Sequence, residues 1–170
     1  MANQYLIPLP RGQSALVSPE DYEWAQSIEW GIIQTKCGSY YAKRNDYINR
    51  KVVCTYMHRE VMRRAGHDMA GRRVDHRNRN SLDNSRGNLR FSTQSQNTAN
   101  SFRKLSRRKR SRYKGVAFIK RSKVNPWSAQ IMVNYAPNYL GVFPTEEAAA
   151  RRYDEEAKRI YGEFAALNFS

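Results

Sequence analysis

The chain has 170 residues, of which 30 are lysine or arginine and 15 are aspartate or glutamate, so its formal net charge is +15. This length allows one ordinary domain or two small ones and excludes a large enzyme with a deep core. The excess positive charge predicts a polyanionic partner, most commonly nucleic acid, and a hydrophobic content of 40% excludes a disordered basic tail.

The sequence also indicates where the protein acts and what it does not bind. No apolar run approaches the roughly 18–20 residues of a membrane span, and the first residues lack the pattern of a secretory signal. Cys37 and Cys54 do not have the spacing of a disulfide framework, and a zinc site that combines them with His58 would fit no usual pattern. We therefore expect a cytoplasmic protein with neither a membrane partner nor a small-molecule substrate.

The first part of the chain, residues 1–101, is predicted to be a nuclease module. Strands are expected in four segments rich in β-branched and aromatic residues, at 14–17, 30–35, 40–44 and 51–56. Short helices are expected at 21–28, after the helix-start signal Ser18-Pro19, and at 57–65. No catalytic pattern precedes residue 57, so this segment is interpreted as scaffold and additional DNA surface.

Residues 72–101 are predicted to form a ββα unit at the end of this module. A strand over 72–75 ends at His76, an Asn-rich loop follows, and a second strand covers 88–91. Ser92-Thr93 is the expected N-cap of a helix that runs from Gln94 to about Ser101. A unit of about 30 residues is too small to be stable alone, so it must pack against the first segment or bind a metal.

The polar residues of this unit predict metal-dependent chemistry. Asp75 and Asn97 offer a carboxylate and an amide oxygen, hard ligands that suit Mg²⁺ or Mn²⁺ better than zinc. They leave coordination positions open for water and phosphate oxygens, as phosphodiester hydrolysis requires. His76 has the ordinary pKa of a general base for neutral pH. Asn88 can either bond the backbone of the His76 loop or accept a hydrogen bond from the imidazole.

The motifs D-H, N-L-R and Q-N occur together in the segment VDHRNRNSLDNSRGNLRFSTQSQNTAN. This segment resembles the HNH endonucleases, specifically the phage homing branch with asparagine in the third position. The resemblance implies a ββα-metal fold in which His76 is the general base, Asn88 orients its loop, and Asp75 and Asn97 bind the metal. It also implies a phosphate contact by Arg90, a phage origin and a homing role. The alternative is an inactive relative that only binds DNA.

Residues 102–112 are predicted to be a basic linker, because they hold seven basic residues and no acidic one. Basic residues that neutralise phosphates release counterions, so this linker should make DNA binding sensitive to salt. The alternatives are a solvated linker and a localisation signal. The expected phosphate contacts are Arg103, Lys104, Arg107, Arg108, Lys109, Arg110 and Arg112.

Residues 113–170 are predicted to form a three-stranded antiparallel sheet packed on one helix. The expected strands are 113–120, 127–133 and 139–143, and the helix begins after Thr145 and ends at Gly162. Residues alternate in the second strand, so Ala129 and Ile131 should face the helix while Gln130 and Met132 face outward.

The stretches YKGV, WSAQI, YLGVF and TEEAAARRYD resemble the DNA-binding domain of plant ethylene-response factors, the Apetala-type domain. Such a sheet can enter the major groove. The alternative is a small packing or protein-binding module. The resemblance places candidate DNA contacts at Lys114, Lys120, Arg121, Gln130, Met132 and Tyr139.

The sequence therefore predicts an α+β protein that hydrolyses phosphodiester bonds in double-stranded DNA with Mg²⁺ or Mn²⁺. One HNH unit per chain predicts a nick, and the pattern leaves open whether the chain acts as a monomer or a dimer. The rival interpretations are a non-enzymatic DNA-binding regulator with an inactive HNH module and a basic RNA-binding protein.

Overall fold

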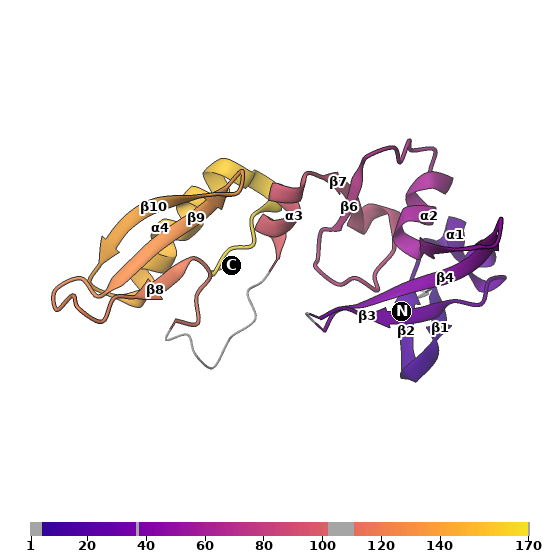
Figure 1. Ribbon diagram of the computed structural model, residues 1–170, viewed down its shortest axis with the longest axis horizontal. Helices are drawn as coiled ribbons and strands as arrows, with labels where there is room; N and C mark the ends of the chain where they lie inside the picture. Colours follow the sequence, from indigo (N-terminus) through magenta and orange to yellow (C-terminus); the bar gives the residue numbers. More distant parts are fainter. Residues whose placement is uncertain (1–4, 37, 102–110, 170) are drawn as a thin grey trace. The chain divides into compact units, whose positions relative to one another are not determined.

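The computed structural model describes residues 5–36, 38–101 and 111–169. By its internal contacts the chain divides into two compact units, residues 1–92 and 93–170, called here the first and the second unit. Both units combine helices with small antiparallel sheets, which confirms the α+β class (Figure 1). Within the described residues, no helix is both long and apolar enough to span a bilayer.

The first unit consists of two hairpins, one three-stranded sheet and two short helices. The hairpins pair β1 with β2 and β6 with β7, and the sheet has the order β3-β4-β5. The elements in chain order are β1 (Leu6–Leu9), β2 (Gln13–Leu16), α1 (Pro19–Gln26), β3 (Gly31–Gln34), β4 (Tyr40–Ile48), β5 (Lys51–Tyr56), α2 (Met57–Arg64), β6 (Arg73–His76) and β7 (Leu89–Ser92).

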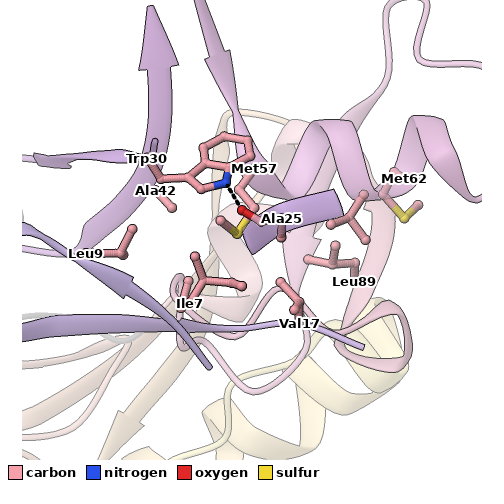
Figure 2. Close-up of a cluster of buried hydrophobic side chains, with 11 residues drawn as sticks. Ile7, Leu9, Val17, Ala25, Trp30, Ala42, Met57, Met62 and Leu89 are labelled. Carbon is pink, nitrogen blue, oxygen red and sulfur yellow. Dashed lines mark hydrogen bonds between the residues drawn. The ribbon is translucent and has the colours of Figure 1, made fainter. Parts of the chain in front are cut away.

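One hydrophobic core joins these elements. Trp30 is buried in it and donates a hydrogen bond from Nε1 to the carbonyl of Ala25, at 2.9 Å (Figure 2). Met57 of α2 and Leu89 of β7 are buried in the same cluster as Ile7 of β1. The β6–β7 hairpin therefore packs on the first segment of the chain, as its small size requires.

The second unit is a three-stranded sheet with a helix across one face (Figure 1). The strand order is β10-β9-β8, and residues such as Ile131 and Tyr153 form the core between sheet and helix. Thr145 caps the long helix, because its side chain accepts a hydrogen bond from the backbone N–H of Ala148 at 3.1 Å. The elements are α3 (Gln94–Asn100), β8 (Val116–Phe118), β9 (Trp127–Val133), β10 (Ala136–Phe143) and α4 (Glu146–Tyr161).

Helix α3 belongs to the second unit, whereas the sequence placed it at the end of the nuclease module, before a boundary at residues 101 and 102. Lys114 donates hydrogen bonds from its ammonium group to the carbonyls of Ala99 and Ser101, the latter at 2.7 Å. The backbone N–H of Ala166 also donates to Ala99, at 3.1 Å. The difference has a physical cause: the carbonyls at the C-terminal end of α3 need donors, and the second unit supplies them.

Candidate active site on the β6–β7 hairpin

Asp75 and His76 are the last two residues of β6. Asp75 pairs with Arg90 of β7 and His76 with Leu89 in the antiparallel register. Both polar side chains are only 5% exposed. Successive residues of a strand point to opposite faces, so the carboxylate and the imidazole lie on different sides of the hairpin.

Arg90 forms a buried ion pair with Asp75. Its Nε and Nη2 atoms each lie 3.0 Å from Oδ2 of Asp75, and Arg90 is 6% exposed. A phosphate contact needs a guanidinium group at the surface. The phosphate contact expected for Arg90 is therefore not supported, because the cation is buried and balances the charge of Asp75.

His76 is held by an asparagine that the sequence analysis did not single out. The Nδ2 atom of Asn84 donates to the carbonyl of Leu82 at 3.2 Å, so its Oδ1 atom is left as an acceptor, 3.5 Å from Nε2 of His76. This arrangement favours the neutral tautomer with the proton on Nε2. Burial lowers the pKa of His76, and its hydrogen bond to Asn84 and the charge of Asp75 act in the opposite direction.

Asn88 joins the two ends of the loop that follows His76. Its Oδ1 atom accepts from the backbone N–H of Asn78 at 3.0 Å, and its Nδ2 atom donates to the carbonyl of Asp83 at 2.7 Å. Two roles were considered for Asn88, bonding the backbone of the loop after His76 or accepting a hydrogen bond from the imidazole, and these two bonds correspond to the first. The residue that accepts a hydrogen bond from the imidazole is Asn84 instead.

A second residue missed by the sequence analysis, Asp21 of α1, fixes the far side of the loop. Asp21 is fully buried, and its carboxylate receives two hydrogen bonds from Arg86, at 2.7 and 2.9 Å. The loop is also held by β2, because the backbone N–H of Leu16 donates a hydrogen bond to the carbonyl of Leu82 at 2.8 Å. The only available signal was an acidic residue in the first turn of a predicted helix, which is common and has no functional meaning by itself.

A side chain near His76 that could offer a hard oxygen ligand to a divalent cation is the carboxylate of Asp75. Within residues 5–36, 38–101 and 111–169, no three His, Cys, Asp or Glu side chains come together as a closed metal site. A single carboxylate suits a cation whose other ligands are water and phosphate. The second expected ligand, Asn97, is half-buried on α3 in the second unit. The zinc alternative finds no support at Cys54, which is exposed, and Cys37 lies outside the described residues.

The outer face of the β8–β10 sheet presents several of the expected DNA contacts. Gln130 of β9 and Tyr139 of β10 are direct cross-strand partners, and both are exposed. Met132 is exposed on the same face of β9, while Ala129 and Ile131 are buried toward α4. The exposed groups outside these strands include Lys120 and Arg121.

Two expected DNA contacts of the second unit have other partners. The ammonium group of Lys114 donates to the carbonyls of Ala99 and Ser101 at the C-terminal end of α3, so it has a structural partner within the second unit. Arg112 is exposed and lies 3.4 Å from Glu147, and an exposed pair of this kind is weak enough to yield to a phosphate. The other expected contacts of the basic linker lie outside the described residues: Arg103, Lys104, Arg107, Arg108, Lys109 and Arg110.

Comparison with known proteins finds relatives for both parts of the chain. An uncharacterized HNH endonuclease of Acanthamoeba polyphaga mimivirus is 37% identical over 95 residues, 56% of this chain and 46% of the viral protein. An AP2/ERF and B3 domain-containing protein of Oryza sativa subsp. japonica is 51% identical over 59 residues, 35% of this chain and 15% of the rice protein. The chain joins an HNH endonuclease-like part to an AP2/ERF-like part.

The HNH-like and AP2-like parts are supported by sequence relatives alone. A second rice protein with AP2/ERF and B3 domains is 48% identical over 58 residues, 34% of this chain and 17% of its own length. No protein-family model and no solved structure matches the chain. The chain spans less than half the length of each of these relatives, so their activities are considered only as proposals for this protein.

Proposed function

We propose that this protein is a metal-dependent DNA endonuclease that nicks one strand of duplex DNA and is held on its target by the AP2-like part. The observation that carries the proposal is the constellation on β6. Asp75 and His76 are adjacent and buried, and His76 is kept neutral beside an acceptor that orients it. The HNH endonuclease relative supports the same chemistry.

His76 acts as the general base in this proposal. Asn84 holds the proton on Nε2, which leaves Nδ1 as the nitrogen that takes a proton from the attacking water. The water oxygen forms a bond to phosphorus as the bond between phosphorus and the 3′ oxygen breaks. The products are a 3′ hydroxyl and a 5′ phosphate, so the atoms balance with water as the only co-reactant.

Asp75 and Asn97 are the residues proposed to hold the divalent ion. When bound, Mg²⁺ or Mn²⁺ would stabilise the negative charge that develops on the phosphate and on the leaving oxygen. The roles of Asp75, the residue before His76 in β6, and of Asn97 are both supported by the sequence pattern. Asn88 contributes indirectly, because its two bonds to the loop backbone keep the residues after His76 in place.

The outer sheet face of the second unit is the proposed DNA-binding surface. Gln130 can hydrogen-bond to base edges, and Tyr139 and Met132 can contact sugars or thymine methyl groups. Lys120, Arg121 and the basic linker would supply phosphate contacts, which position the protein without reading sequence. A phage origin and a homing role remain predictions from the resemblance, since the viral relative comes from a mimivirus.

One observation favours a second candidate, a DNA-binding regulator without catalysis. Arg90 already balances the charge of Asp75, and a carboxylate with a buried cationic partner has less need of a metal ion. The AP2/ERF relatives are consistent with this alternative, because DNA binding alone would use the second unit.

Plasmid relaxation separates the two candidates. The full chain is incubated with supercoiled plasmid in Mg²⁺, in Mn²⁺ or in EDTA, alongside the variants His76→Ala and His67→Ala. We expect nicked circles with wild type and His67→Ala in either ion, and none with His76→Ala or EDTA. Intact supercoiled plasmid under every ion, together with retained DNA binding, would establish the regulator.

A further inference from the structure

Two aromatic rings contact His76, and a third supports them. The ring of His58, in the first turn of α2, has its centroid 5.3 Å from the centroid of the His76 ring, at an interplanar angle of 67°. All ring distances below are also between centroids. Tyr41 of β4 lies 6.0 Å from His76 and 5.6 Å from His58. Tyr56 lies 5.6 Å from His58 and 6.1 Å from Tyr41. The pairs His58–His76, Tyr41–His76 and Tyr41–Tyr56 have the steep angles of edge-to-face attraction, and the other two pairs are tilted.

The backbone that carries His58 is firmly anchored. Its neighbour Met57 and the residue one turn later, Val61, are both fully buried in the core of the first unit. Arg59 ties the same turn to the segment before β6 by donating from Nη1 to the carbonyl of Arg72 at 2.9 Å. A side chain on such a turn has little freedom to move away from its neighbours.

His58 is an uncharged ring at neutral pH. Burial lowers the pKa of His58 to about 3, and electrostatic interactions with the neighbouring His76 and Arg59 act in the same direction. A neutral ring in this place is a packing surface for His76 and not a cation for phosphate. None of the chemistry proposed above uses it.

We propose that His58 is a positioning residue that fixes the plane of the His76 imidazole, with Tyr41 and Tyr56 holding His58 in turn. The inference rests on the proposed role of His76 as the base. Asn84 determines which nitrogen carries the proton, and His58 determines where the ring faces. Orientation of this kind matters because a small misplacement of a reacting group can lower a rate by roughly 100-fold.

Two substitutions of His58 test whether His76 needs an aromatic ring beside it or only a side chain of similar volume. His58→Phe keeps an aromatic ring and removes the nitrogens, whereas His58→Leu keeps comparable volume without a ring. With the full chain and plasmid DNA, we expect His58→Leu to lower kcat roughly 10- to 100-fold with little change in KM. His58→Phe should restore kcat to near the wild-type value. Equal kcat in the two variants, or loss in both, would overturn the proposal.

A readout without DNA or metal separates this inference from the proposed function. The imidazole NMR signals of His76 are sensitive to its neighbours and broaden when the ring exchanges between orientations, and His67→Leu is the matched control elsewhere in the first unit. We expect His58→Leu, or His58→Asn if the leucine variant does not fold, to shift and broaden these signals, while His58→Phe and His67→Leu leave them sharp. Unchanged signals would refute the positioning role even in an active nuclease. If the signals are disturbed in His58→Leu but the wild type never cleaves DNA, the positioning of His76 by His58 stands and only the proposed nuclease function is refuted.

Discussion

Arg90 and Asp75 form a buried ion pair between the two strands of the β6–β7 hairpin, with Nε and Nη2 both 3.0 Å from the same carboxylate oxygen. Breaking a buried pair by removing one partner leaves an uncompensated charge and costs roughly 3–5 kcal/mol. The proposed metal ligand and the stability of the hairpin are therefore coupled through Arg90.

The substitution Arg90→Met should destabilise the first unit and increase its response to divalent ions. Loss of the Arg90 partner of the Asp75 carboxylate would lower the free energy of unfolding by roughly 3–5 kcal/mol, and Mg²⁺ should recover part of that loss by binding the carboxylate. Urea unfolding with and without Mg²⁺ measures both effects. Arg73→Met, at an exposed position of β6, is the control. A variant as stable as that control would show that the ion pair contributes little.

Substitution of Asn84 should impair catalysis without weakening DNA binding. Asn84 is almost completely buried and cannot contact DNA, but it accepts from Nε2 of His76. In Asn84→Ala the proton is free to occupy Nδ1, so kcat should fall by roughly 10-fold or more, a part of the 10²–10⁴ that a general base supplies. Nicking rates and gel-shift affinities are compared with those of Asn45→Ala, an exposed control on β4. If Asn84→Ala also lost affinity for DNA, the prediction that Asn84 serves catalysis and not binding would be wrong.

The stability of the first unit should fall in mild acid because of His58. Its pKa is lowered from 6.5 to about 3 in the folded state, so the unfolded state binds more protons between these values. Stability from this residue is complete above pH 6.5 and is lost progressively as the pH falls toward 3. Between pH 7 and pH 5 the loss should be on the order of 2 kcal/mol. His58→Phe should show a shallower pH dependence in thermal unfolding, and identical slopes would contradict the burial of a neutral imidazole.

The sequence predicted the β6–β7 hairpin well, because a strand ending at His76 and a second strand from residue 88 have strong local signals. Asp21 and Asn84 could not be found in the same way. Their importance depends on contacts with Arg86 and His76 that only the folded chain brings together. Arg90 illustrates the opposite error, since a basic residue in a nuclease motif suggests phosphate until its burial is known.

Lys114 and Lys120 should differ in their effect on DNA binding. Lys120 is exposed, whereas Lys114 bonds the carbonyl end of α3. Lys120→Met should reduce the slope of log affinity against log salt by about 0.9 if it contacts one phosphate. Lys114→Met should leave that slope unchanged and speed amide exchange in α3. If the slope were reduced in both variants, Lys114 would also contact DNA.

Gly115 should be intolerant of any side chain. Its φ is +76°, and an added Cβ would lie 2.0 Å from the ring of Tyr153 and 2.7 Å from the carbonyl oxygen of Gln130. Gly115→Ala should therefore destabilise the second unit by several kcal/mol, about 3 or more. Gly66→Ala, also at positive φ but with open space around it, should cost only about 1 kcal/mol. Thermal unfolding of both variants tests the contrast, and equal losses would show that the ring of Tyr153 moves aside.

The second unit was the easier one to predict, because alternation in β9 and the Thr145 cap are local signals. The residue at which this unit begins was harder to predict. Helix α3 is short and has a capping box of its own at Thr93, so the sequence indicates where it starts but not which unit supplies donors for its carbonyl end. The contacts of Lys114 and Ala166 decide that question in the folded chain.

The attachment of α3 to the second unit has a consequence for recombining such proteins. A chimera joined after residue 101, where the nuclease motif ends in the sequence, would separate α3 from Lys114 and Ala166 and leave its terminal carbonyls to a foreign partner. A junction between Ser92 and Thr93 keeps the helix with the donors that hold it. Exchange of the second unit, whether by evolution or by protein engineering, should therefore carry Asn97 along with it.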